Sequence, residues 1–204
     1  MGRHSDRESE ISSALNSVLS SYNTGQHRYL DEFIKQWQSA SDLLILGIYP
    51  NAKEITESYA AFNCVRTKLK YDLSDPNCAV VCVGDGRSPR TAALFAFRTG
   101  WHCISIDPML DERKIPVWES KVQRLTCIPK KVEDVDLMFD KVTICCVHSH
   151  ANLPNVLEHI RGKVRSLVAI PCCIPYNHDA TSHREYHDAG VWSPHNLVKY
   201  WRTI

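Results

Sequence analysis

The stretch between Ala79 and Pro108 constrains the fold of this chain more than any other feature. It opens with a short apolar run rich in β-branched residues and breaks into a turn that contains Gly84 and Gly86. A helical pattern follows, and a second strand-like run ends at Asp107. A strand, a glycine turn, a helix and a strand ending in an acid are typical of nucleotide-binding α/β folds, where the acid binds ribose hydroxyls. The sequence therefore indicates a nucleotide-like ligand before it indicates a reaction.

Strand and helix patterns keep alternating after this stretch. Alternation of this type implies a parallel sheet with right-handed crossovers, and nearly continuous apolar strands fit a sheet covered on both faces. We therefore predict an α/β fold with a Rossmann-like, mostly parallel sheet flanked by helices, seven-stranded or slightly truncated. The predicted strands are 79–83, 102–106, 125–128, 142–147 and 167–170, with helices at 89–98 and 155–160.

The residues before the first strand have helical spacing. We predict an N-terminal helical extension or lid over residues 1–74, joined to a Rossmann-like domain over 75–204 in one compact unit. The tail is expected to form a final helix and an added strand or flap. The expected N-terminal helices are 8–22, 27–39 and 51–70, and the run 43–46 is ambiguous between helix and strand.

Composition narrows the class of protein. The net charge is +1, so no global basic field argues for nucleic acid. Nine cysteines are an odd count for a disulfide framework, and several fall inside predicted strands, which favours a reduced, intracellular, cytoplasmic protein. No apolar run approaches the roughly 20 residues of a membrane helix, and the N-terminus lacks the apolar core of a signal peptide. No membrane partner is expected.

The stretch 79–173 resembles class I S-adenosylmethionine-dependent methyltransferases. The first motif of that family is an acid followed by alternating glycines. Cys82 stands at the acid's position here, and the glycine positions hold Gly84, Gly86 and Ser88. Asp107 matches the acid that holds the adenosyl ribose, and Glu133-Asp134 lies near the family's adenine contact. The resemblance implies S-adenosylmethionine as cofactor, bound by Gly84, Asp85, Gly86, Arg87, Asp107 and Asp134.

The missing first acid is the main departure from the family. Asp85 could substitute for it from one turn later. Arg87 and Arg90 are unusual beside a sulfonium, and could bind the carboxylate of the methionine moiety or a phosphate. A plain strand-to-helix turn is the alternative interpretation of the glycine pair.

A second group of polar residues follows the strand at 142–147. In the family that the chain resembles, the loop at this position faces the transferred methyl group. We therefore predict that His148, His150 and Asn152 orient or deprotonate the acceptor, since histidine titrates near neutrality. Attack on a sulfonium methyl needs mainly a nucleophile held in line, so positioning could suffice.

Cysteines and histidines near the C-terminus raise two further hypotheses. Zinc could bind there, although adjacent cysteines rarely both chelate one tetrahedral ion and no Cys-x-x-Cys occurs. Cys172 or Cys173 could instead act as a nucleophile beside a histidine base. The candidate zinc ligands are Cys172, Cys173, His178, His183 and His187.

Three functions remain in competition. The favoured one is methyl transfer from S-adenosylmethionine to an unidentified acceptor. The second is a catalytically inactive binding or regulatory subunit that acts through a protein partner, kept open by the absent acid. The third, a nicotinamide-dependent oxidoreductase, is opposed by Pro89 at the third glycine position. RNA is favoured as acceptor over a protein or metabolite because basic residues cluster at the predicted mouth, at Arg66, Lys68, Arg87 and Arg90.

Overall fold

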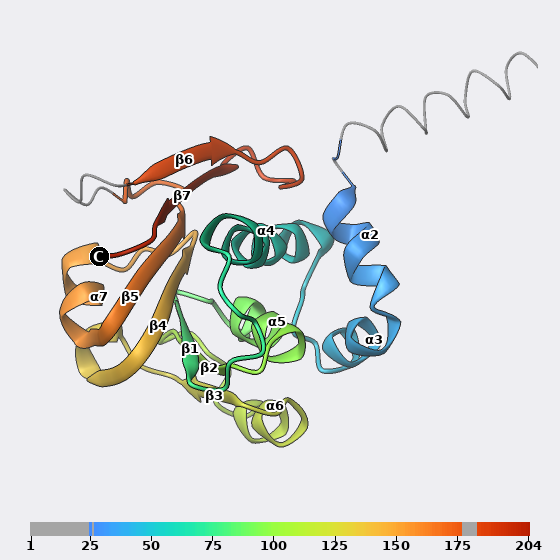
Figure 1. Cartoon of the computed structure of the whole chain (residues 1–204). Helices are drawn as coiled ribbons and strands as arrows, with labels where there is room; N and C mark the ends of the chain where they lie inside the picture. Colours follow the sequence, from blue (N-terminus) through green and yellow to red (C-terminus); the bar gives the residue numbers. More distant parts are fainter. Residues whose placement is uncertain (1–24, 26, 177–182) are drawn as a thin grey trace, which may run out of the picture.

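A seven-stranded sheet forms the centre of the molecule, in the order β3-β2-β1-β4-β5-β7-β6 (Figure 1). The computed structural model describes residues 25, 27–176 and 183–204. Strands β1 to β5 pair in parallel, whereas β7 runs antiparallel to both β5 and β6. The predicted Rossmann-like, mostly parallel sheet is therefore confirmed. The strands are β1 (Cys78–Val83), β2 (His102–Ile106), β3 (Leu125–Ile128), β4 (Leu137–Val147), β5 (Ile160–Ile170), β6 (Arg184–His187) and β7 (Leu197–Trp201).

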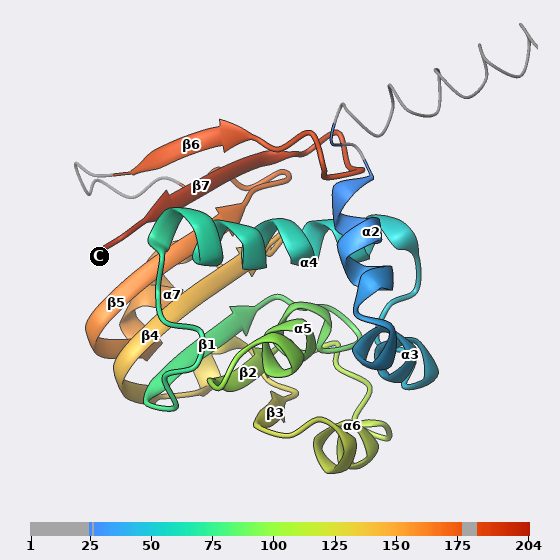
Figure 2. The same ribbon diagram turned by 45° about the vertical axis from the view of Figure 1, so that its right-hand side comes forward.

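Helices cover the two faces of the sheet unequally. Helices α4 and α5 lie along one face, with α2 and α3 outside them, whereas α7 covers the opposite face and α6 lies by β3 (Figure 2). The helices are α2 (Arg28–Lys35), α3 (Trp37–Ile45), α4 (Ala52–Cys64), α5 (Arg90–Arg98), α6 (Ile115–Lys121) and α7 (Leu153–His159), with a π turn η1 (Val65–Leu69) and a 3-10 turn η2 (Val132–Asp134). Among the residues described, no helix is both long and apolar enough to cross a membrane.

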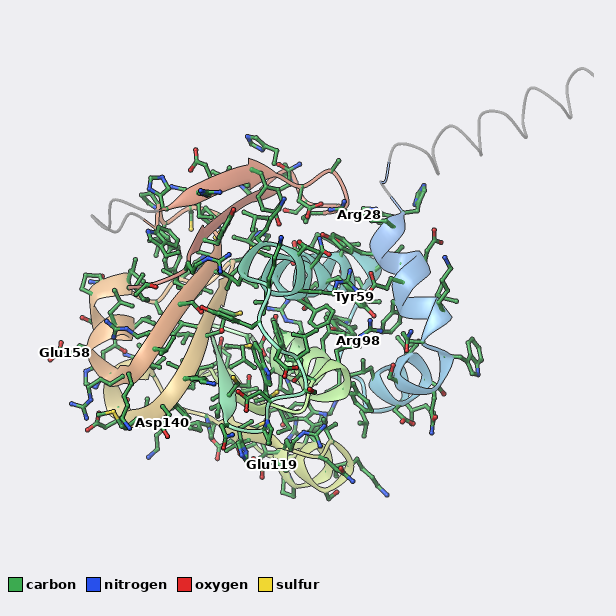
Figure 3. All side chains as sticks on the ribbon, viewed as in Figure 1. Arg28, Tyr59, Arg98, Glu119, Asp140 and Glu158 are labelled. Atoms are coloured by element: carbon green, nitrogen blue, oxygen red, sulfur yellow. The ribbon has the colours of Figure 1, made fainter. Side chains whose placement is uncertain are left out.

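Aromatic side chains join the N-terminal helices to the sheet. Tyr59 and Phe62 of α4 are each 1% exposed and belong to one apolar cluster with β1 residues. Arg98 of α5 lies over both rings, its guanidinium carbon 6.0 Å from the Tyr59 centroid and 5.3 Å from that of Phe62 (Figure 3). Glu32 accepts a hydrogen bond from Arg98 at 2.9 Å. Tyr59 and Phe62 are thus core residues.

Several element boundaries differ from the sequence-based ones. Strands β4 and β5 begin at 137 and 160, earlier than predicted. The sequence pattern missed their first halves because these are partly exposed and carry charges such as the Asp140–Lys163 ion pair. The 27–39 helix breaks at Gln36, and the ambiguous run 43–46 falls almost wholly in α3. The final helix expected in the tail is wrong for 183–204, where two strands form instead. The helix predicted over 8–22 lies outside the described residues.

Candidate functional site

Four loops at the carboxyl edge of the sheet enclose a cavity of about 590 Å³. They follow β1, β2, β3 and β4, and the strand order reverses between β1 and β4. Open α/β sheets bind ligands at such a switch point. The residues that line the cavity include Gly84, Gly86, Arg90, Asp107, Met109, Lys130, Lys131, Glu133, His148, Ser149, His150 and Asn152.

The turn after β1 depends on two glycines in the left-handed region. Gly84 has φ +75° and Gly86 has φ +86°, conformations that other residues rarely adopt. A Cβ on Gly84 would lie 2.3 Å from the Ser149 hydroxyl oxygen and 2.9 Å from the Ser149 Cα. Gly84 therefore allows the β4 loop to contact the turn directly, which brings two walls of the cavity together.

Asp107 fixes the other side of this turn. Its carboxylate accepts a hydrogen bond from the Gly86 amide at 2.8 Å and another from the Met109 amide at 2.7 Å. The side chain is largely buried yet lines the cavity. Each carboxylate oxygen can accept more than one hydrogen bond, so Asp107 can hold the turn and still accept from a ligand hydroxyl.

Asp85 does not line the cavity, contrary to the sequence-based prediction that it substitutes for the missing acid. Its carboxylate accepts hydrogen bonds from the Thr91 amide at 2.9 Å, the Ala92 amide at 3.2 Å and the Ser105 hydroxyl at 3.1 Å. It thereby caps the N-terminus of α5, where backbone N–H groups lack helical partners. Burial raises the pKa of Asp85 to about 6, against the lowering effect of these hydrogen bonds.

Arg87 and Asp134 also lie outside this cavity. Arg87 lines an adjoining cavity of about 410 Å³, between the β1 turn and α6. Asp134 lines a separate groove near α7, and its neighbour Glu133 lines both that groove and the main cavity. Arg90 lines both cavities and pairs with Glu54 of α4. Of the two arginines considered for an anionic ligand group, Arg90 is therefore the one that reaches the main cavity.

His148 is held from two sides at the end of β4. Its Nδ1 lies 3.3 Å from a carboxylate oxygen of Glu57, and its Nε2 lies 3.2 Å from the backbone oxygen of His195. Its φ of +50° is left-handed, which is unusual for a residue with a side chain. Burial lowers the pKa of His148, and the nearby Glu57 carboxylate opposes this effect.

Glu57 is a site residue that the sequence analysis did not predict. It is 2% exposed and pairs with Lys53 at 2.8 Å. The signal was its helical register, because Glu57 shares a face with Ala60, Ala61 and Cys64. A carboxylate on a face of small buried residues requires a partner, and His148 provides one.

His150 lies beside two cysteines, Cys172 and Cys173. Its Nε2 is 3.5 Å from the Cys172 sulfur and 3.2 Å from the Cys173 sulfur, and the two sulfurs are 3.6 Å apart. The candidate zinc ligands His183 and His187 lie elsewhere. His183 lies near Glu185 and Trp201, and His187 contacts Asn196 in the β6–β7 hairpin. His178 lies outside the described residues.

The basic cluster expected at the mouth is only partly assembled. Arg66 donates to Glu32 at 2.7 Å, and the Lys68 amine lies 5.1 Å from the centre of the Tyr186 ring. Both follow the C-terminal end of α4, whereas its N-terminal half, with Glu54 and Glu57, faces the site. The cations that line the two cavities are Arg87, Arg90, Lys114, Lys130 and Lys131.

No protein-family model matches this chain. No curated protein matches it either. Among solved structures, it is similar to a point mutant of MtNAS in complex with S-adenosylmethionine, with 14% identity over 86% of this chain and 74% of the other, and a TM-score of 0.47. A 1,6-didemethyltoxoflavin-N1-methyltransferase from Burkholderia thailandensis gives 16% identity over 85% and 72% of the two chains, with a TM-score of 0.42.

A third similar structure is a phosphoethanolamine N-methyltransferase from Haemonchus contortus in complex with phosphoethanolamine and S-adenosylhomocysteine. It shares 15% identity over 74% of this chain and 34% of its own, with a TM-score of 0.44. The strand order and pairing of the sheet themselves identify the fold class.

Proposed function

We propose that this chain binds S-adenosylmethionine in the cavity at the β1–β4 switch point and transfers its methyl group to an acceptor. One arrangement carries the proposal. The Asp107 carboxylate and the Gly84–Gly86 turn meet in one cavity. This cavity offers hydrogen-bond donors and acceptors to the ribose of the cofactor and to the methionine chain attached to it.

Each part of the cofactor has a proposed partner. Asp107 accepts from the ribose hydroxyls, and the adenine packs between the β2 and β3 loops, near Met109 and Val132. Glu133 replaces Asp134 as the acid on that side. Arg90 is the proposed partner of the methionine carboxylate. His148, His150 and Asn152 form the acceptor side of the same cavity.

The transfer itself needs few reacting protein groups. A lone pair of the acceptor forms a bond to the methyl carbon, and the carbon–sulfur bond breaks with its electrons moving to sulfur. S-adenosylhomocysteine leaves, and the acceptor loses its proton to solvent or a nearby base. Positioning the nucleophile in line with the sulfonium supplies most of the needed acceleration.

Calorimetry with S-adenosylmethionine and S-adenosylhomocysteine tests the cofactor site. We expect Asp107→Asn to weaken both about 10- to 100-fold, the value of about one hydrogen bond to a charged acceptor. Asp134→Asn is the matched control, because Asp134 is a neighbouring acid outside the cavity. Equal affinity in all three proteins, or no binding by the unaltered chain, would refute the proposed site. Binding without any methyl transfer would favour the inactive regulatory subunit.

We propose RNA as the acceptor class, on the strength of the cations around the two cavities. Lys130 and Lys131 line the main cavity, while Arg87 and Lys114 line the adjoining one. Phosphate contacts by such residues make binding sensitive to salt.

Transfer of a labelled methyl group from S-adenosylmethionine to a pool of short single-stranded RNAs tests this acceptor class. Lys130→Ala with Lys131→Ala should reduce it, and Lys163→Ala, an exposed lysine near the start of β5, should not. Labelling that survives ribonuclease would instead indicate a protein or small-molecule acceptor.

A further inference from the structure

The loops after β4 and β5 bring His150, Cys172 and Cys173 into one cluster at the edge of the main cavity. The ligand atoms of all three lie within 4.8 Å of one another, and this is the one such group among the described residues. The cause is the strand register. Strands β4 and β5 pair in parallel up to Val147 and Ile170, so the residues three positions beyond each strand, His150 and Cys173, emerge side by side.

The spacing of the three ligand atoms matches a tetrahedral zinc centre. Zinc binds cysteine sulfur at about 2.3 Å and histidine nitrogen at about 2.0–2.1 Å, which at tetrahedral angles separates two sulfurs by about 3.8 Å and a sulfur from a nitrogen by about 3.5 Å. The corresponding distances here are 3.6 Å between the sulfurs, and 3.5 and 3.2 Å from each sulfur to the His150 Nε2. A single ion can therefore reach all three atoms with only small side-chain adjustments.

We propose that His150, Cys172 and Cys173 bind a zinc ion through Nε2 and the two sulfurs. Soft thiolates with one imidazole select zinc over magnesium or calcium, which prefer oxygen ligands. Three protein ligands leave the fourth tetrahedral position open, the arrangement found at zinc ions that bind water or substrate rather than at closed structural ions. His150 lines the cavity and Cys173 is exposed, so this fourth position is accessible.

The exposure of the two cysteines also agrees with a bound ion. The remaining seven cysteines are buried, so Cys172 and Cys173 are the two whose sulfurs an ion can approach from outside. A zinc ion would tie the β4 and β5 loops together. The proposal does not depend on methyl transfer, because it rests on the ligand geometry alone.

Metal titration of the full chain tests the site. Reduced protein is stripped of metal, loaded with Zn²⁺ and analysed for bound metal. One zinc per chain is expected, and the variants Cys172→Ser, Cys173→Ser and His150→Gln should each weaken it by more than the 10- to 100-fold that loss of an outer-shell partner costs. Cys78→Ser and His102→Gln are matched controls, because both residues lie at the amino ends of strands. Absence of stoichiometric zinc, or ligand variants that bind zinc as tightly as the unaltered chain, overturns the proposal.

Cobalt substitution and alkylation separate a metal site from a reactive thiol. Co²⁺-loaded protein should show thiolate charge-transfer absorption and the strong visible bands of tetrahedral cobalt, lost in either cysteine variant. Added mercaptoethanol should shift these bands by entering the open position. Zinc should protect both cysteines from iodoacetamide, as mapped by mass spectrometry. Octahedral cobalt bands, or continued fast alkylation of one cysteine in zinc-loaded protein, would contradict the site and favour a nucleophilic cysteine beside His150. Circular dichroism of each variant verifies that the fold is retained.

Discussion

Gly84→Ala is the substitution whose cost the structure specifies best. The φ of +75° is left-handed, and an L-residue there loses about 1–2 kcal/mol. The new Cβ would also meet Ser149 at 2.3 Å from its oxygen, 2.7 Å from its Cβ and 2.9 Å from its Cα. The last of these is backbone and cannot rotate away. Forced overpacking costs roughly 1–3 kcal/mol, so we expect a total loss of about 2–5 kcal/mol.

Gly47→Ala provides a matched control for the backbone term. Gly47 has a similar left-handed φ of +62°, but the nearest atom to its added Cβ is the flexible end of Lys114 at 3.7 Å. This variant should lose only the conformational part, about 1–2 kcal/mol. Urea denaturation followed by circular dichroism yields both free energies of unfolding. The difference between the two variants measures the contact between the glycine turn and the β4 loop.

Ser149→Gly in the Gly84→Ala background extends the measurement. It removes the Ser149 Cβ and oxygen but leaves the Cα at 2.9 Å, so it should restore part of the lost stability. Residues in contact typically show coupling energies of about 0.5–3 kcal/mol. If Gly84→Ala costs no more than Gly47→Ala, and Ser149→Gly restores nothing, then the β4 loop does not pack on the turn. The reasoning that joins the two walls of the cavity would then be refuted.

Three further outcomes can be measured on the same protein. Burial raises the pKa of Asp85 from 3.8 to about 6. The contribution of Asp85 to stability is therefore present below its unfolded-state pKa and is lost, by up to about 3 kcal/mol, as the pH rises to its folded-state pKa. Asp85→Asn should remove this part of the pH dependence in urea titrations, and an unchanged profile would contradict it. Glu32→Gln should lower the free energy of unfolding by about 1–3 kcal/mol, because Glu32 accepts hydrogen bonds from both Arg66 and Arg98. Asp136→Asn, which breaks an exposed pair with Arg161, should lower it by less than about 1 kcal/mol. Equal losses in the two variants would refute this distinction. Tyr29→Phe should destabilise the chain by about 1–3 kcal/mol in thermal unfolding, since it leaves the buried carboxylate of Asp188 with one donor fewer, and a neutral result would show that the bond is replaced.

The parts of the fold predictable from sequence are those buried on both faces. Every residue of β1 is buried, so its apolar run is continuous and its limits are clear. The first half of β4 alternates between partly buried and exposed residues and ends with the exposed Asp140 and Lys141. The first half of β4 therefore lacks the continuous apolar run from which the second half could be predicted as a strand. The tail strands β6 and β7 contain mixed polar and aromatic residues, which leave helix and strand equally open.

The candidate site was predictable where the backbone alone determines position. Gly84, Gly86 and Asp107 are placed by the ends of β1 and β2, and all three line the cavity. Asp85 was not predictable, because a side chain between two left-handed glycines can point inward or outward, and hydrogen bonds to α5 direct it inward. The pairing of His150 with Cys173 was also hidden, since it depends on the register of β4 against β5 and not on closeness in sequence.

The contacts of His148 bear on the chemistry of the acceptor side. Both ring nitrogens face acceptors, the Glu57 carboxylate and the His195 carbonyl. Both nitrogens are directed at these two groups, so we propose that His148 fixes the β4 loop rather than removing a proton. Methyl transfer tolerates such a division, because the acceptor can lose its proton after attack and needs chiefly to be held in line. Where the acceptor must lose a proton, we propose that solvent takes it, because the His150 Nε2 belongs to the proposed zinc site.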